Sequence, residues 1–431
     1  MTRRDTSKSR MLSPPSEVKG MQCLDRSAFR KKVDVVSLAV EENKVGALNR
    51  HLRKHTVCMR NLKNIRVDTD GRRCFLLHPD IFSSVDEAKE ILSKTEFSEM
   101  LNEAEYRLVE LNIGYENWTA EEVLRAVLPD EVPNVTGFSV IGHVAHLNLK
   151  EAHFSYKHLI GQVLLDKHKN LRSVVNKTDS IDNTYRNFVM ELLAGVDDMN
   201  VIAKENGCSF KFDFSKVYWN SRLATEHERI ISEVTPDTIV FDAFAGVGPF
   251  SVPSAKKGAT VYANDLNPNS YEALCSNMKS NKVKGEYQTF NMDGRNFIST
   301  IVKEQLLHAT ESVKQHIVIM NLPATAIRFL DSFVGLLNDA RDFQAPKTKG
   351  IQIFCYCFSN EADYGEDVAS RINGVLCVDS NSVTSSQCRR VRNVAPNKDM
   401  ICAQFYIKWN TMVELKTSDD VIEKKRPKLA S

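Results

Sequence analysis

The most regular pattern in the sequence is an alternation of short apolar runs with amphipathic stretches that begins near residue 235. The apolar runs have the length of buried strands, and the longer stretches between them have helical spacing. The predicted strands are Thr238–Phe241, Thr260–Ala263, Tyr287–Asn291, His316–Met320, Ile351–Phe358 and Ile401–Trp409, with helices such as Pro268–Asn281 and Ala326–Asn338 between them. Strands that alternate with helices form a parallel sheet covered on both faces, so the pattern predicts an α/β fold.

The first half of the chain has a different pattern. Apolar residues at helical spacing predict a helix within Ser83–Leu111. A second helix is predicted over Thr119–Val127, because Thr119 can cap its first turn and Glu122 lies three residues further on. After prolines at positions 129 and 133, which mark a boundary, Phe138–Leu149 is predicted to form a strand.

The composition fits a large soluble protein. The 431 residues are 42% hydrophobic and 26% charged, which suits two or three domains, and no apolar run has the roughly 18 residues of a membrane span. The charge is uneven: residues 1–73 hold 18 Lys and Arg against 8 Asp and Glu, whereas residues 74–131 hold 4 against 14. The basic front end suits a polyanionic partner, and the alternative is two charged surfaces in contact with each other.

Both ends of the chain are polar and basic. Residues 1–16 have the composition of a disordered or targeting segment, and the tail 413–431 contains the basic cluster Lys424–Lys428. Such a cluster is typical of nuclear import, and the alternative is a solvated tail. We therefore expect the protein in the nucleus and the cytoplasm, with the mitochondrial matrix as a further compartment.

The cysteines and histidines do not indicate a metal or a disulfide framework. No C-x-x-C occurs among the ten cysteines, and Cys355 and Cys357 are expected as buried thiols on one strand face, in a reducing compartment. His143 and His146 would point to opposite faces of a strand. We expect no metal site.

A glycine-rich turn follows the first strand of the alternating region. Asp242 ends that strand, and Gly246 and Gly248 allow the tight turn and the close approach of a ligand to the backbone. A dinucleotide fingerprint would have a third glycine where Ser251 stands, and Pro249 lies in the turn, so a dehydrogenase is a distant alternative. The run resembles the first motif of Rossmann-like methyltransferases, in which Asp242 would help hold the methionine end of S-adenosylmethionine.

Two further acids follow the next two strands. Asp265 lies 23 residues beyond Asp242, where a carboxylate can accept hydrogen bonds from both ribose hydroxyls. The alternative for Asp265 is a cap of the helix from Pro268, for which Asn267 is the better candidate. Asp293 resembles the acceptor for the adenine amino group, with Gly294 beside the ring, and its alternative is also a helix cap.

The fourth strand ends in Asn321-Leu322-Pro323-Ala324, which resembles the N-x-P-x motif of methyltransferases that modify nitrogen atoms. The Asn321 carbonyl and the neighbouring backbone carbonyls can fix a nitrogen nucleophile in line with the methyl group, and Pro323 makes the loop rigid. The alternative is a simple turn at the strand end. Enzymes that methylate exocyclic amines usually have an aromatic residue where Ala324 stands.

Two longer runs resemble one family specifically. Asn183–Gly195 and Phe212–His227, followed by the cofactor motifs and Asn321–Ala324, match the eukaryotic and archaeal tRNA (guanine(37)-N(1))-methyltransferases in order, over about residues 142–409. The resemblance implies a Rossmann-like, mostly parallel sheet with an antiparallel last strand, preceded by smaller α+β RNA-binding domains. It places a tRNA-docking region at 17–131, a middle domain at 132–213 and the methyltransferase domain at 214–412.

The resemblance also implies residue roles. Guanine N1 carries a proton whose removal shifts charge onto O6, so a carboxylate and a cation are needed. The family assigns Glu226 as general base, Arg186 as the cation facing O6, Asn321 as the residue that orients the base and Pro323 as the residue that shapes its contact. The implied cofactor contacts are His227, Asp242, Gly246, Gly248, Asp265, Leu266, Asp293, Gly294 and Asn321. Tyr185, Tyr218 and Arg222 are the implied substrate contacts. From the residues alone, Glu226 could instead form an ion pair with Arg222, four positions before it, and Tyr218 and Trp219 could pack in the core.

The leading hypothesis is therefore methylation of N1 of guanosine 37 in tRNA, which supports reading-frame maintenance. The expected partners are S-adenosylmethionine and tRNA, gripped at the anticodon stem-loop and at the elbow, with no membrane and with the chain as a monomer. One alternative is an exocyclic-amine methyltransferase acting on adenine N6 or guanine N2 of RNA. Another is a tRNA-binding protein that has lost catalysis.

Overall fold

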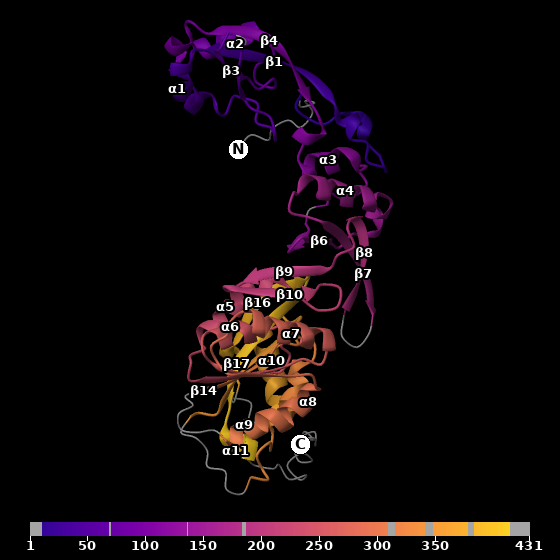
Figure 1. Cartoon of the computed structure of the whole chain (residues 1–431), viewed down its shortest axis with the longest axis vertical. Coiled ribbons are helices and arrows are strands. Elements are labelled where there is room, and N and C mark those ends of the chain that lie inside the picture. Colours follow the sequence, from indigo (N-terminus) through magenta and orange to yellow (C-terminus); the bar gives the residue numbers. More distant parts are fainter. Residues whose placement is uncertain are drawn as a thin grey trace, which may run out of the picture. The chain divides into compact units, whose positions relative to one another are not determined.

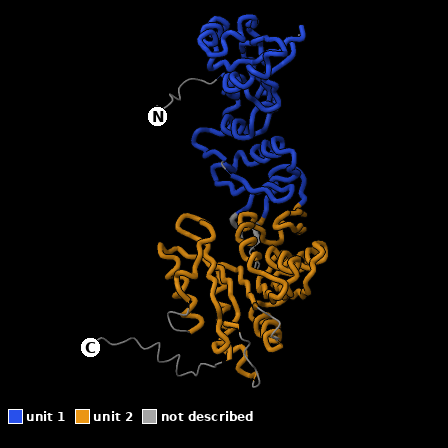
Figure 2. The backbone as a smooth tube through the Cα atoms, turned by 90° about the vertical axis from the view of Figure 1, so that its left-hand side faces the viewer, with its two compact units in different colours: residues 1–178, 190–198 blue, residues 179–189, 199–431 orange. Residues whose placement is uncertain are grey.

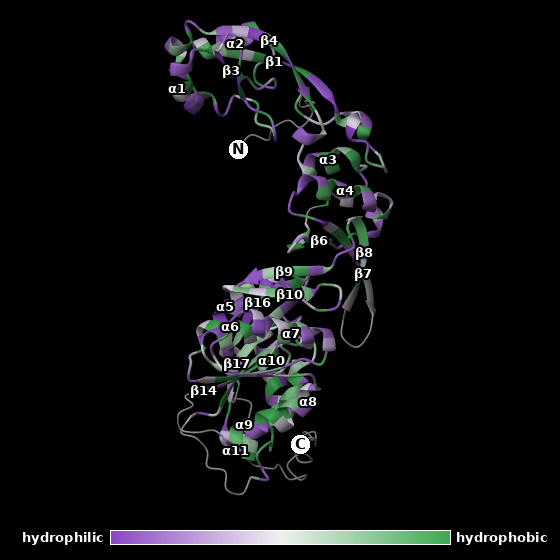
Figure 3. Ribbon diagram, in the orientation of Figure 1, coloured by the Kyte–Doolittle hydropathy of each residue, from purple (hydrophilic) through white to green (hydrophobic). Residues whose placement is uncertain are grey.

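The computed structural model describes residues 11–68, 70–135, 137–182, 187–308, 315–340, 348–377 and 383–413. The chain divides into two compact units (Figure 2). Unit 1 comprises residues 1–178 with 190–198, and unit 2 comprises residues 179–189 with 199–431. Figure 3 shows that hydrophobic residues gather in the strands and the helices that flank them.

Unit 1 begins with an antiparallel sheet of strand order β2-β3-β1-β4. Its elements are β1 (Lys31–Val40), α1 (Glu42–Leu52), β2 (Ile65–Val67), β3 (Arg73–Leu76), α2 (Val85–Ser93) and β4 (Glu105–Ile113). The predicted helix within Ser83–Leu111 is therefore wrong for its second half, where Leu111 pairs with Val33 of β1. Leu111 and Ile113 are buried while Asn112 between them is exposed, which is the two-residue period of a strand.

Two α-helices and a second sheet follow among the described residues, and the part of this sheet within residues 179–189 belongs to unit 2. The elements are α3 (Ala120–Val127), β5 (Ser139–Ile141), β6 (Val144–Leu147), α4 (Lys157–Lys167), β7 (Ser173–Asp182) and β8 (Asn187–Gly195), with sheet order β5-β6-β7-β8. The helix predicted over Thr119–Val127 is confirmed, and Thr119 and Glu122 form the capping box. The single strand predicted over Phe138–Leu149 is a hairpin instead, because the chain turns at Gly142, whose φ is +56°. His143 follows that glycine in the turn and contacts the Asp198 carbonyl.

Unit 2 is built on a seven-stranded sheet of order β13-β12-β11-β14-β15-β17-β16. Figure 1 labels β14, β16 and β17 of this sheet. The strands are β11 (Thr238–Asp242), β12 (Thr260–Asn264), β13 (Tyr287–Phe290), β14 (Gln315–Met320), β15 (Ile351–Ser359), β16 (Cys388–Ala395) and β17 (Lys398–Ile407). The first five run parallel, β17 pairs antiparallel with β15, and β16 pairs antiparallel with β17. The predicted mostly parallel α/β sheet with an antiparallel last strand is confirmed, and β16 is an addition.

Helices and a hairpin complete unit 2. They are β9 (Asn200–Glu205) with β10 (Cys208–Asp213), α5 (Ala224–Ser232), α6 (Ser251–Lys256), α7 (Pro268–Ser280), α8 (Gly294–Phe297), α9 (Lys303–Leu307), α10 (Tyr364–Leu376) and α11 (Trp409–Val413). The segment predicted as a helix over Ala326–Asn338 is a shorter 3-10 helix, Ala326–Phe333. The inner apolar residues of α10 pack on one sheet face, together with Cys355 and Cys357. Burial raises the pKa of the Cys357 thiol to about 12, in line with the predicted buried thiols.

A membrane span and a metal site were not expected from the sequence, and the described residues bear on both. Within those residues no helix is long and apolar enough to cross a membrane. Nor do the residues that the structure describes bring together three or more His, Cys, Asp or Glu side chains in a group able to hold a metal ion.

Candidate active site

The predicted cofactor residues lie at one edge of the unit 2 sheet. Asp242 is the last residue of β11, Asp265 follows β12, Asp293 follows β13 and Asn321 follows β14. Because these four strands are parallel neighbours, their carboxyl ends meet at the same edge. Ligands of open α/β sheets bind at this edge, so the fold brings together residues that are separated by up to 79 positions in the chain.

The glycine-rich turn has the geometry of a ligand cradle. Gly246 has φ +56° and a side chain there would meet no atom within 4 Å, so its face is open. Gly248 has φ +97°, and a side chain there would lie 2.7 Å from Val252 and 2.8 Å from Leu274. Gly246 therefore leaves room for a ligand, whereas Gly248 allows the turn to pack against Val252 and Leu274 of the two helices that follow it.

Asp265 holds this turn in place. Its Oδ2 accepts a hydrogen bond of 2.7 Å from the Gly246 backbone N–H, and its Oδ1 accepts one of 2.9 Å from Asn267. Asn267 in turn caps α7 through the N–H of Asn269, as the sequence predicted. Asp265 is thus free of the capping role, and each of its oxygens keeps a lone pair for a further donor.

Asp242 is a fully buried carboxyl group. Its Oδ2 accepts a 2.5 Å hydrogen bond from the Ser251 hydroxyl, whereas Oδ1 has no partner of good geometry among the described residues. Burial raises the pKa of Asp242 from 3.8 to about 7, and the nearby Asp265 carboxylate contributes. An acceptor atom of this kind, inside the cradle, suits a cationic ligand group.

Asn264 is a site residue that the sequence analysis missed. Its amide donates to the carbonyls of Ala243 and Met292 at 3.1 and 3.0 Å, and its Oδ1 accepts from the Met292 N–H at 3.1 Å. One buried side chain therefore joins the loops that follow three strands. The available signal was a polar residue at the end of an otherwise apolar strand, directly before Asp265.

Asp293 lies in the loop after β13 and caps the helix that follows it. Its carboxylate accepts a 2.8 Å hydrogen bond from the Arg295 N–H and so caps α8, which was the alternative interpretation. This bond occupies only one oxygen, so the adenine role stays a prediction. A side chain at Gly294 would lie 2.8 Å from the Phe244 ring, which explains the glycine by packing. Leu266 is 46% exposed and can contact a ligand.

Glu226 is buried on α5 and does not pair with Arg222. Its carboxylate instead accepts two hydrogen bonds from Arg229, at 2.9 and 2.7 Å, and one of 2.9 Å from the Tyr356 hydroxyl. Arg222 lies in the 3-10 turn Ser221–Leu223 before α5 begins, so the four-residue helical spacing does not apply to it. The ion pair with Arg222 is therefore excluded for this structure.

His227 is buried next to Glu226 and points to the turn. Its Nδ1 lies 2.5 Å from the Glu205 carboxylate of β9, and its ring packs edge-on against Phe250 with centroids 4.6 Å apart. Nε2 is buried without a partner among the described residues. Glu205, which the sequence analysis missed, thus fixes the ring and leaves Nε2 for a ligand.

The predicted substrate residues are only partly described. Tyr218 is 60% exposed, whereas Trp219 is buried between Phe210 and Phe212, with ring centroids 5.2 Å away in both cases. The core interpretation therefore holds for Trp219 and not for Tyr218, and Arg222 is exposed. Tyr185 and Arg186 lie outside the described residues.

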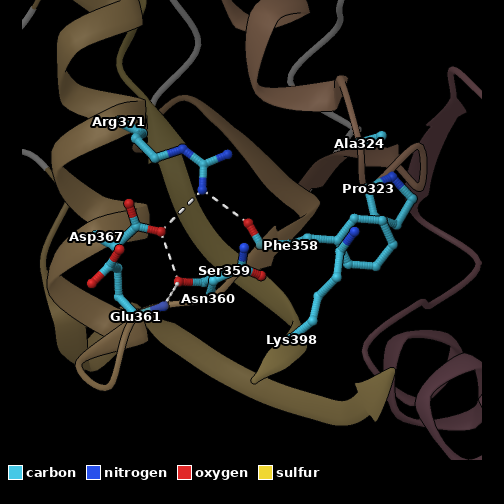
Figure 4. Close-up of a pocket in the computed structure, with 9 residues that line it drawn as sticks. All are labelled: Pro323, Ala324, Phe358, Ser359, Asn360, Glu361, Asp367, Arg371 and Lys398. Carbon is cyan, nitrogen blue, oxygen red and sulfur yellow. Dashed lines mark hydrogen bonds and ion pairs between the residues drawn. The ribbon is translucent and has the colours of Figure 1, made fainter. Parts of the chain in front are cut away.

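A pocket of about 410 Å³ adjoins the Asn321–Ala324 loop (Figure 4). Pro323 and Ala324 line it together with Phe358 and Lys398, and the Lys398 ammonium lies 4.6 Å from the Phe358 ring centre. The remaining lining residues are Ser359, Asn360, Glu361, Asp367 and Arg371. The Pro323 carbonyl accepts a 3.2 Å hydrogen bond from the Phe358 N–H, which ties the loop to β15.

Comparison with known proteins identifies the family. Residues 201–341 match the TRM5/TYW2 methyltransferase domain, and residues 120–198 match the TYW2 N-terminal domain. The tRNA (guanine(37)-N(1))-methyltransferase of Xenopus tropicalis is 43% identical over 97% of this chain and 85% of its own length. The chain belongs to the tRNA (guanine(37)-N(1))-methyltransferase family. The mouse member is 44% identical over 94% of this chain and 81% of its own length, and that of Drosophila melanogaster is 43% identical over 94% and 89%.

Solved structures show the same fold. Trm5b from Pyrococcus abyssi has a TM-score of 0.59 and 24% identity, covering 87% of this chain and 99% of its own. The structure of aTrm5 in complex with tRNALeu also has a TM-score of 0.59, with 22% identity, and covers 86% of this chain and all of its own. These likenesses show the fold, and the predicted resemblance to the family is confirmed by the relatives at 43–44% identity.

The cofactor of this family is S-adenosylmethionine, and the residues described above fit it. The open face of Gly246 offers space for a ligand, and the buried Oδ1 of Asp242 offers an acceptor for a cationic group. The remaining lone pairs of Asp265 offer acceptors for two hydroxyls. The described residues therefore match the methionine and ribose portions of the cofactor.

Proposed function

We propose that this protein transfers a methyl group from S-adenosylmethionine to N1 of guanosine 37 in tRNA. The observation that carries the proposal is the position of the Glu226 carboxylate. It is held by Tyr356, and the residue before Tyr356, Cys355, pairs with Met320, which directly precedes Asn321. The buried Glu226 carboxylate is thus held by β15 at the position along the sheet where the Asn321–Ala324 loop begins.

The residues have complementary roles in the proposed reaction. Glu226 takes the N1 proton, and the positive charge of Arg186 stabilises the negative charge that develops on O6. Asn321 orients the guanine, and Pro323 keeps its loop in one conformation. S-adenosylmethionine supplies an electrophilic methyl group. The residues that position this group by binding the rest of the cofactor are Asp242, Asp265, Asp293, His227, Leu266, Gly246 and Gly248.

The same proposal covers the partner and the compartment. Exposed Tyr218 and Arg222 can stack on an unpaired base and contact phosphates of the anticodon loop, and unit 1 would dock the tRNA elbow. The name of the relatives and the complex of aTrm5 with tRNALeu support tRNA as substrate. We propose that the chain acts as a monomer in the nucleus and cytoplasm, and in the mitochondrial matrix, and that its product supports reading-frame maintenance.

A pair of variants tests the base. Glu226→Gln should still bind tRNA, while single-turnover methylation at neutral pH falls by about 10²–10⁴, the usual scale of acid–base assistance. Glu228→Gln, at an exposed position of the same helix, should behave as the wild type. Near-normal turnover of Glu226→Gln would remove Glu226 from this role.

A substrate series tests the nitrogen that is methylated. Transcripts with guanosine or inosine at position 37 are methylated and their nucleosides identified by mass spectrometry. Inosine keeps N1 but lacks the exocyclic amine, so its methylation supports N1. Failure on inosine would favour guanine N2, and absence of any transfer together with intact tRNA binding would favour a non-catalytic binding protein.

A further inference from the structure

The hydrogen bonds around Glu226 distinguish its two oxygens. Oε1 accepts from Arg229 Nη2 at 2.7 Å and from the Tyr356 hydroxyl at 2.9 Å. Oε2 accepts only from Arg229 Nε, at 2.9 Å, among the described residues. Since a carboxylate oxygen has two lone-pair sites, Oε1 is filled and Oε2 keeps one.

We infer that Arg229 and Tyr356 are positioning residues that reserve Oε2 of Glu226 as the atom that accepts the guanine N1 proton. The inference rests on the proposed function and deepens it. The N1–H bond breaks and an O–H bond forms at Oε2, while the N1 electron pair bonds to the methyl carbon. The bond between that carbon and sulfur breaks, and the sulfur keeps its electron pair.

Arg229 is itself fixed by its neighbours. Its Nη1 donates to Gln404 Oε1 at 3.2 Å and lies 3.7 Å from Glu233, and its guanidinium lies 5.7 Å from the Phe354 ring centre. Gln404 donates to the same Glu233 carboxylate at 3.0 and 3.2 Å. The cation therefore cannot turn away from Glu226 without breaking several contacts at once.

The ionisable groups that donate hydrogen bonds to Glu226 keep their protons. Arg229 approaches Glu226 from α5, Tyr356 from β15 and Cys402 from β17, while Glu233, which follows α5, faces Arg229. Burial raises the pKa of the Tyr356 hydroxyl well above its usual value, so it remains a donor. Hydrogen bonding to Glu226 raises the pKa of Arg229 further above its usual range. Both groups stabilise the ionised carboxylate, which is the form that can accept a proton.

The test uses two conservative variants of the full chain. Tyr356→Phe frees a lone pair on Oε1, and Arg229→Lys replaces a two-point contact by a point charge. We expect each to lower the single-turnover rate by about 10-fold, with the Kd for S-adenosylmethionine and for tRNA unchanged. The acidic limb of the pH–rate profile should move to higher pH in both, because the ionised carboxylate loses a donor.

The controls separate this inference from a structural role and from the proposed function. Tyr406→Phe, at a partly exposed position of β17, should leave both rate and profile unchanged. Loss of rate in Tyr356→Phe and Arg229→Lys with an unmoved acidic limb would overturn the inference, since loss of packing alone lowers the rate without moving the limb. If Glu226→Gln is severely impaired but the acidic limb does not move in Tyr356→Phe and Arg229→Lys, only this inference is wrong. Normal turnover of Glu226→Gln would instead contradict the assignment of Glu226 as the base.

Discussion

The Gly246 backbone N–H donates a 2.7 Å hydrogen bond to Oδ2 of Asp265, which joins the turn after β11 to the end of β12. The same carboxylate accepts from the Asn267 N–H through Oδ1. Asp265 therefore shapes the protein side of the cofactor site with one lone pair on each oxygen. Each oxygen thus keeps a second lone pair, which is the number of acceptors that the two hydroxyls of a ribose require.

Asp265→Ala should weaken S-adenosylmethionine binding by 10²-fold or more. Two hydrogen bonds to a charged group are lost, each of which contributes about 1.5–3 kcal/mol. Calorimetric titration measures this directly, and binding of tRNA in the absence of the cofactor should not change. Glu272→Ala, at an exposed position on α7, is the matched control. An affinity within threefold of the wild type would exclude Asp265 from the ribose role.

Cofactor binding should release a proton near pH 6, because the pKa of Asp242 is raised to about 7 by burial. A cationic cofactor group favours the ionised carboxylate, so affinity should increase with pH and level off above about pH 7. Calorimetry at pH 6 in buffers of different ionisation enthalpy counts the released protons. In Asp242→Asn the number of protons released on binding should fall by the number that Asp242 contributes. An unchanged number of released protons would contradict the prediction.

The same carboxyl group should affect the stability of the cofactor-free protein. In the native state it binds a proton more readily than in the unfolded state, whose pKa is near 3.8. Its contribution is fully present below about pH 3.8 and is lost as the pH rises through about 7. Asp242→Asn should therefore raise the midpoint of thermal unfolding relative to the wild type more at pH 8 than at pH 5. A difference that is the same at both values would argue against a native carboxyl that takes up protons in this range.

Prediction from the sequence is correct where a pattern is local. The strand that ends at Asp242, the turn glycines and the Asn267 cap are each encoded within a few residues, and the structure has them. It failed where tertiary contacts decide. Leu111 lies in a stretch with a helical period, but it forms a strand because β1 supplies a pairing partner. β16 was missed because its exposed arginines break the apolar pattern of a strand.

The candidate site shows the same limit. Spacing along a helix suggested Arg222 as the partner of Glu226, but α5 begins only at Ala224. The actual partners are Arg229, one turn further along, and Tyr356, 130 positions away. Contacts between elements that are far apart in the chain, such as that of Tyr356 with Glu226 of α5, leave no periodic trace in a single sequence, so they could not be anticipated.

Tyr218 and Trp219 are adjacent but should respond differently to truncation. Trp219→Ala removes a buried ring from between Phe210 and Phe212 and should lower the free energy of unfolding by about 3–5 kcal/mol. Tyr218→Ala changes an exposed ring and should leave stability nearly unchanged while weakening tRNA binding, since stacking on a base contributes about 1–3 kcal/mol. Denaturant unfolding and filter binding of tRNA check the two effects. Equal tRNA affinity of Tyr218→Ala and the wild type would remove Tyr218 from the substrate site.

Asn264→Leu should damage both stability and cofactor binding, because this amide is the link between three strand-end loops. The substitution keeps a similar volume but leaves the buried carbonyls of Ala243 and Met292 and the Met292 N–H without their partner. Each unsatisfied buried group costs about 1–3 kcal/mol, so we expect a loss of roughly 3 kcal/mol or more in the free energy of unfolding.

The affinity for the cofactor separates a local role of Asn264 in the site from a general effect on stability. If Asn264 holds the loops that carry Asp265 and Asp293, the folded fraction of Asn264→Leu should bind S-adenosylmethionine at least 10-fold more weakly than the wild type. Asn281→Leu provides the comparison, because Asn281 is also buried and bonded to backbone, through Ser209, but lies at the end of α7. It should lose stability while keeping its affinity for the cofactor. Equal losses of affinity in both variants would mean that Asn264 acts only through general stability.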